Sequence, residues 1–190
     1  MKCLINIKGL QKYIMETTTN SSAINYGLYL GAALSLITVA IYAVNIDLML
    51  EIWLGIFLFL IVLACGVASA IKTRKLLNGF LSFKKAFTSY FITIAVGTLI
   101  ATIVGIAIFT YIDPEAAVYL NEQTLILTKK MMERFGMPQE AMQVALEEAS
   151  KKDNFSLEMQ AQGFVFKLAF YAVIGLIVAL IVKKTDTTDA

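Results

Sequence analysis

The chain has 190 residues, of which 58% are apolar and 16% are charged, and its net charge is +2. An ordinary soluble domain has about 25% charged residues, so this composition excludes that class and indicates a protein of the lipid bilayer. The small net charge also excludes a nucleic-acid-binding protein, in which basic residues gather on one face.

Residues 1–22 are predicted to form a cytoplasmic N-terminal segment. They carry Lys2, Lys8 and Lys12 but no apolar core long enough for a cleavable signal peptide. The polar run 17–22 is typical of a linker, and Met15 in front of it is an alternative native start. We expect the first apolar stretch to serve as the targeting signal.

Four apolar stretches are long enough to cross a bilayer, and they cover residues 24–44, 52–71, 87–112 and 164–182. A helix rises about 1.5 Å per residue, so roughly 20 residues cross the hydrocarbon layer of about 30 Å. Lipid cannot satisfy free backbone groups, which makes helices the default. The predicted fold is an all-α integral membrane protein, with a bundle of four transmembrane helices in residues 23–184.

The connection between the second and third stretches is basic. Its cationic side chains are Lys72, Arg74, Lys75, Lys84 and Lys85, whereas the first connection has no Lys or Arg. Because basic connections stay on the cytoplasmic side, both termini and the tail 185–190 are predicted to be cytoplasmic. The same side chains suit contact with anionic lipid headgroups, although topology alone explains them equally well.

Aromatic residues accompany these lysines at the start of the third stretch. They are Phe80, Phe83, Phe87, Tyr90 and Phe91. Aromatic side chains collect at membrane interfaces, so this run is predicted to anchor the helix there.

Residues 113–163 are predicted to form an extracytoplasmic helical insert between the third and fourth spans. Asp113 is suited to cap a helix that has Pro114 at its first position. Apolar residues then recur at helical spacing, namely Leu120, Leu127, Met131 and Phe135. A second helix follows from Pro138, so the insert is expected to be a small helical cap on the bundle.

Small residues recur at four-residue spacing in all four stretches. They are Gly27, Gly31, Gly66, Gly97, Ala101, Gly105, Gly175 and Ala179. Such stripes let helix backbones approach closely inside a membrane. Packing within one bundle is favoured over homodimerisation through Gly27 and Gly31, because every stretch carries a stripe.

Four charged residues are predicted near the outer membrane surface, namely Asp47, Glu51, Asp113 and Lys167. One interpretation is an outward-facing cation or substrate site that Lys167 tunes. The favoured interpretation is interfacial carboxylates together with a lysine that snorkels to water.

The sequence has no histidine and no nucleophile or phosphate-binding motif, so no enzymatic activity, cofactor or metal is predicted. The leading hypothesis is a noncatalytic interaction or structural protein with a homo-oligomeric or membrane-protein partner. The alternative is an oligomeric small-solute transporter or channel subunit with a path lined by Thr93, Thr98 and Thr102. An enzyme is a distant third, which would need Glu51 and Asp113 to converge in one pocket.

Two short runs resemble a known family. They are Gly79-Phe80-Leu81-Ser82-Phe83-Lys84-Lys85-Ala86-Phe87 and Tyr111-Ile112-Asp113-Pro114. The chain resembles, over roughly Ala23 to Lys184, an uncharacterised family of bacterial membrane proteins catalogued as domain of unknown function 4199. The resemblance implies a four-span protein of the bacterial inner membrane, and it transfers no catalytic residues.

Overall fold

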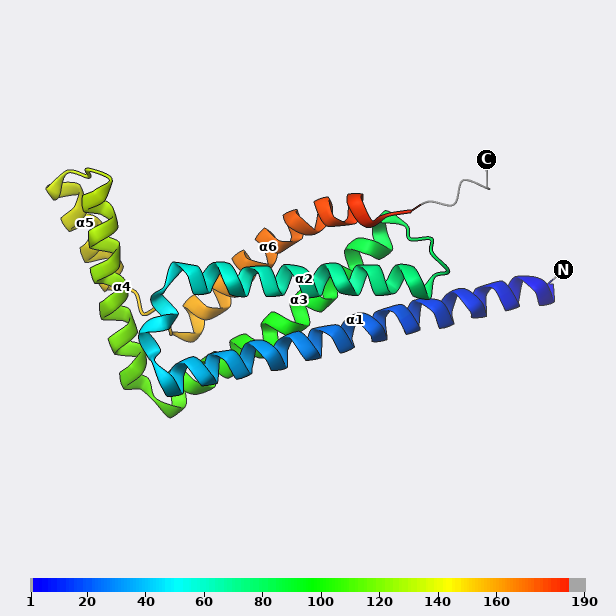
Figure 1. Cartoon of the computed structure of the whole chain (residues 1–190), viewed down its shortest axis with the longest axis horizontal. Coiled ribbons are helices and arrows are strands. Elements are labelled where there is room, and N and C mark those ends of the chain that lie inside the picture. The colour runs from blue at the N-terminus through cyan, green and yellow to red at the C-terminus, as the bar shows by residue number, and fades with distance from the viewer. Residues whose placement is uncertain (1, 185–190) are drawn as a thin grey trace.

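The computed structural model describes residues 2–184, so Met1 and the predicted tail 185–190 lie outside the described residues. Four long helices lie side by side, namely α1 (Lys2–Val44), α2 (Ile52–Leu76), α3 (Phe83–Ile106) and α6 (Leu157–Val182), as Figure 1 shows. Four segments are long and apolar enough to cross a membrane: Thr17–Val44, Ile52–Leu76, Phe83–Ile112 and Leu157–Val182. The prediction of an all-helical chain with four apolar helices is confirmed.

Helix α1 is continuous through the polar run that suggested a linker. The run contains neither glycine nor proline, so nothing in it breaks a helix. Its Thr19 hydroxyl donates to the Met15 carbonyl one turn earlier, at 3.0 Å. The linker expectation is therefore wrong, because threonine and serine hydroxyls satisfy themselves on the helix's own backbone.

Helix α3 is the centre of the bundle, because it packs against α1, α2 and α6. Its Tyr90 is fully buried. A β-carbon on Gly66 of α2 would lie 2.7 Å from one edge of the Tyr90 ring, and one on Gly175 of α6 would lie 2.7 Å from the opposite edge. Tyr90 is thus a core residue that joins three helices, and its predicted role as an interfacial anchor is wrong.

The other close approaches lie between α1 and α3. A β-carbon on Gly27 or Gly31 would come within 2.8 Å of Val96 or Ile100, and one on Gly97 would come within 2.7 Å of Leu30. The Gly27 and Gly31 face of α1 is therefore covered by α3 of the same chain.

The remaining small residues differ from one another. Ala179 is fully buried in the main core, and Ala101 packs against that core. Gly105 has nothing within 4 Å of an added β-carbon, so it contributes open space instead of a helix contact.

One end of the bundle carries the start of α1, the α2–α3 connection and the end of α6 (Figure 1). Leu81 and Lys184 exchange two backbone hydrogen bonds of 2.8 and 2.9 Å, which tie the connection to the end of α6. The other end carries the short helix η1 (Ile46–Leu50) and the insert.

The insert begins where α3 widens into the π-helix η2 (Ala107–Ile112). The Asp113 side chain then accepts from the Ala116 amide at 3.0 Å and caps α4 (Pro114–Arg134), as predicted. After α5 (Gln139–Ser150), the Ser156 hydroxyl caps α6.

Helices α4 and α5 form a hairpin that runs across the end of the bundle (Figure 1). On α4, Ala117 and Leu120 are buried in a small core with Ile108 and Phe109. The next apolar residues of the same periodic pattern are exposed, with 41% for Leu127, 53% for Met131 and 84% for Phe135. The apolar residues of this pattern therefore pack in a core only where α4 lies over the bundle.

Candidate functional site

A cavity of about 350 Å³ lies between α1, α2, α3 and α6, in the half of the bundle nearer the insert. Its walls are mainly apolar and aromatic, with Leu34, Leu58, Phe59, Val62, Phe109, Phe155 and Tyr171. Its polar groups are Thr38, Thr98, Thr102, Gln160 and Lys167. Gly55 and Gly105 also line it, and neither has any atom within 4 Å of an added β-carbon. These two glycines help to keep the cavity open.

Lys167 is the single charged residue among the described residues that line this cavity. It lies ten residues after the start of α6, or about 15 Å along the helix axis, inside the apolar segment. The residue lines the cavity and is also exposed at the surface of the bundle. No described side chain forms an ion pair or hydrogen bond with its amine. A cation without a counter-ion within a membrane span is costly, so such a residue is a candidate for a functional site.

The predicted partners of Lys167 are engaged elsewhere. The Tyr42 hydroxyl donates to Asp113 at 2.9 Å, and the Tyr119 hydroxyl donates to Asp47 at 2.7 Å. Glu51 lies exposed at the start of α2 and makes no side-chain cap. Among the described residues, no hydrogen bond or ion pair joins any two of these four charged side chains.

These bonds shift the titration of the groups outside the spans. Donation by the Ala116 amide, with a smaller contribution from the Tyr42 hydroxyl, lowers the pKa of Asp113 below its ordinary value. Donation to the Asp47 carboxylate raises the pKa of Tyr119. Asp47 and Asp113 thus act as structural acceptors that join η1, α4 and the end of α1.

Two aromatic rings separate the cavity from a second, polar cleft of about 540 Å³. Phe109 of η2 and Phe155 before α6 line both spaces, and their ring centroids are 4.9 Å apart. The Thr110 hydroxyl donates to the Phe155 carbonyl at 3.3 Å. The π-helix supplies both Phe109 and Thr110, which agrees with the frequent occurrence of π-helices at functional sites.

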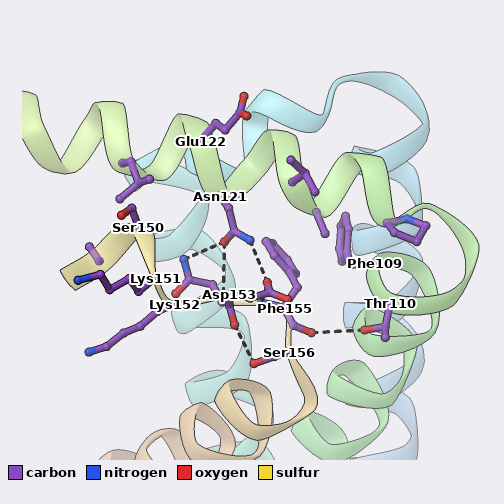
Figure 2. Close-up of a pocket in the computed structure, with 16 residues that line it drawn as sticks. Phe109, Thr110, Asn121, Glu122, Ser150, Lys151, Lys152, Asp153, Phe155 and Ser156 are labelled. Carbon is purple, nitrogen blue, oxygen red and sulfur yellow. Dashed lines mark hydrogen bonds between the residues drawn. The ribbon is translucent and has the colours of Figure 1, made fainter. Parts of the chain in front are cut away.

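Figure 2 shows how the polar cleft is built. Asn121 of α4 points toward Asp153, and its amide donates to Asp153 at 2.9 Å. The Asn121 carbonyl oxygen accepts from the Asn154 side-chain amide at 3.0 Å. The Asp153 carboxylate also accepts from the Phe155 amide at 2.9 Å. Because these groups satisfy one another, the cleft is a structural junction between the insert and α6.

The three threonines of the predicted transport path lie in two environments. Thr98 and Thr102 line the cavity. Thr93 is fully buried, and its hydroxyl lies 2.9 Å from the Ala23 carbonyl and 2.7 Å from the Ser69 hydroxyl. Ile94, which follows Thr93 on α3 and precedes Thr98, is also fully buried. Thr93 therefore lies in the packed core and does not line the cavity.

Sequence reasoning had singled out Lys167, Thr98 and Thr102, but not the aromatic walls. Phe59, Phe109, Phe155 and Tyr171 come from three spans and the insert, and each lies in an apolar or mixed segment where no spacing distinguishes it. The sequence feature that pointed to this cavity was the lone Lys167 within an apolar stretch.

Residues 25–184 match the family described as protein of unknown function (DUF4199). No curated protein matches the chain. No solved structure matches it either. The match covers most of the chain, including the insert, three apolar segments in full and most of the first, so the chain belongs to the family of proteins of unknown function DUF4199.

Proposed function

We propose that this protein is a noncatalytic multi-pass membrane protein that binds an anionic amphiphile in the cavity between α1, α2, α3 and α6. Such a ligand has an apolar body and one carboxylate or phosphate group. The observation that carries the proposal is the unpaired Lys167, which lies inside a span and lines a mainly apolar cavity.

The walls and the charge favour one class of ligand. Ligand pockets are concave and mostly apolar, with few polar groups that orient the ligand, and they typically measure roughly 300–1,000 Å³. Phe59, Phe109 and Tyr171 offer surface to an apolar chain. In the low dielectric of a membrane, the Lys167 cation attracts an anion more strongly than it would in water. A ligand with both features satisfies the walls and the charge together.

A binding role is favoured over catalysis by the composition of the cavity. Among the residues that line it there is no carboxylate, histidine or cysteine. General acid–base catalysis needs a positioned proton donor or acceptor with a pKa suited to the task, and one lysine supplies no acid–base pair.

The proposal places the protein in the bacterial inner membrane with both termini in the cytoplasm and the α4–α5 hairpin outside. The basic α2–α3 connection supports this orientation through the usual retention of Lys and Arg in the cytoplasm. Because α4 runs across the end of the bundle, its exposed Leu127 and Met131 then lie along the outer membrane interface.

Binding of a fluorescent fatty acid to the purified protein in neutral-lipid nanodiscs tests this function. An interaction with a charged partner contributes about 1.5–3 kcal/mol, so Lys167→Gln is expected to weaken binding by roughly 10- to 100-fold. Lys167→Arg is expected to retain most of the affinity.

Lys152→Gln is the matched control, because it removes the same charge from the polar cleft without touching the cavity. Its affinity should equal that of the unchanged protein. Equal affinity of Lys167→Gln and the unchanged protein would rule out the proposed site.

Transport of the same amphiphile is the second candidate function. Phe109 and Phe155 are shared by the cavity and the polar cleft, so displacement of one ring would join the two spaces. The test measures how fast the fluorescent fatty acid crosses the membrane of proteoliposomes. A rate no higher than in protein-free liposomes would exclude transport and leave binding as the single proposed function.

A further inference from the structure

A third space, a pocket of about 410 Å³, lies at the opposite end of the bundle, where α1, α2 and α3 meet. All of the residues that line it are polar: Thr19, Asn20, Thr73, Ser82, Lys84, Lys85, Thr88 and Ser89. A pocket lined by polar residues alone is unusual beside apolar spans, where polar groups are costly unless they have partners.

The charge of this pocket has one sign. Lys84 and Lys85 lie in the first turn of α3, whose start is capped by the Ser82 hydroxyl. No carboxylate lines the pocket, and neither lysine forms an ion pair with a described side chain. The first turn of a helix adds partial positive charge from its free amides. Every electrostatic feature of the lining therefore favours an anion.

The inner wall continues into a chain of buried hydroxyls. Thr73 lies 2.7 Å from Ser89, Ser89 lies 2.9 Å from Ser69, and Ser69 lies 2.7 Å from Thr93, which bonds to the Ala23 carbonyl. Thr73 and Ser89 belong both to this chain and to the pocket lining. Each hydroxyl donates only one proton, so the chain can present one proton to a bound oxyanion, that of Thr73, when Thr93 donates to Ser69 instead of to the Ala23 carbonyl.

We infer that this pocket is a binding site for a phosphate group, supplied by an anionic lipid headgroup or by a soluble phosphate. Two lysines provide the charge, and the Ser82, Thr88 and Asn20 side chains provide neutral donors. The site is separate from the cavity at Lys167, since the two share no lining residue.

The α2–α3 connection provides an internal comparison. Lys72 and Lys75 lie at the end of α2, near the same end of the bundle, and both are exposed. Neither lines the pocket. Removal of this pair changes the net charge as much as removal of Lys84 and Lys85, but leaves the pocket intact.

The test is titration of the full chain, in a neutral detergent, with inorganic phosphate and with dihexanoyl phosphatidic acid. Each basic residue near an anionic partner contributes about 1 kcal/mol, so Lys84→Gln with Lys85→Gln is expected to weaken binding about 25-fold. Lys72→Gln with Lys75→Gln is expected to weaken it less than about threefold, because these lysines act only through screened surface charge.

The two probes distinguish the source of the phosphate. Binding of phosphatidic acid alone would support a lipid headgroup, and binding of both probes would support a site for phosphate itself. Equal weakening by the two lysine pairs would overturn the inference in favour of diffuse attraction, and so would failure of both probes to bind.

Thr88→Val tests the site independently, in case the lysine variants do not fold. It removes one lining hydroxyl without changing charge, and it is expected to weaken binding about tenfold, as for the loss of one hydrogen bond to a charged group. Unchanged affinity in Thr88→Val, together with normal binding by any folded Lys84→Gln variant, would also contradict the site.

Discussion

At the scale of single residues, the packing of three helices depends on Tyr90. One edge of its ring lies against Gly66 of α2, and the opposite edge lies against Gly175 of α6. Gly175→Ala would place a methyl group 2.7 Å from the ring, and the ring cannot retreat because Gly66 closes the other edge. Overpacking of a core costs about 1–3 kcal/mol, so we expect a clearly lower midpoint of thermal unfolding in detergent.

The control is Gly163→Ala on the same helix, where nothing lies within 4 Å of an added β-carbon. It should leave the midpoint unchanged or raise it slightly, because alanine suits a helix better than glycine. Tyr90→Leu in the Gly175→Ala protein should recover part of the loss. Strictly additive effects of the two substitutions would show that they do not meet in the core.

The role of single residues could be predicted where chemistry is local. Asp113 was expected to cap α4 because the cap depends only on a side chain and the next three amides. Tyr90 was misjudged because its burial depends on two glycines that lie 24 residues before it and 85 residues after it in the chain. Such distant approaches leave no local pattern.

At the scale of elements, α4 changes environment along its length. Its apolar residues pack on the bundle at Ala117 and Leu120, then continue as the exposed Leu127 and Met131. Amphipathic helices of this kind bury an apolar face about 5–10 Å into the interface. With Cys3 and Cys65 replaced, a bimane label on Met131→Cys should be quenched by lipids that carry a nitroxide near the headgroup.

A label on Lys129→Cys is the matched comparison, because residues two apart on a helix face nearly opposite sides. It should be quenched much less. Equal quenching at both positions would show that this part of α4 does not lie on the membrane.

The spans were predictable because long apolar runs leave little alternative to helices in a bilayer. Predicted span ends at Val44, Ile112 and Val182 agree with the structure. The starts were placed too late in three spans, because polar residues such as those in 17–22 extend a helix beyond the apolar run. The π-helix at Ala107–Ile112 had no sequence signal, since it depends on how α3 meets α4.

At the scale of the whole molecule, α1, α2 and α6 pack around α3, and the two proposed binding spaces lie toward opposite ends of the bundle. The space near the insert is mainly apolar with one lysine, and the space at the basic end is lined by polar residues. The sequence indicated Lys167 and the basic residues, but the spaces arise from how helices diverge along their length. Open positions such as Gly105 could not be told from packing glycines, because both occur in the same stripe.

The most direct test of the central claim is photo-crosslinking with a diazirine-bearing fatty acid in native membranes, followed by peptide mapping. We expect labels on the cavity residues, such as Phe59 and Tyr171, and their loss in Gly105→Leu, whose new side chain projects into the cavity. Labels confined to lipid-facing residues such as Leu36 and Ile103, and unchanged in Gly105→Leu, would contradict the account.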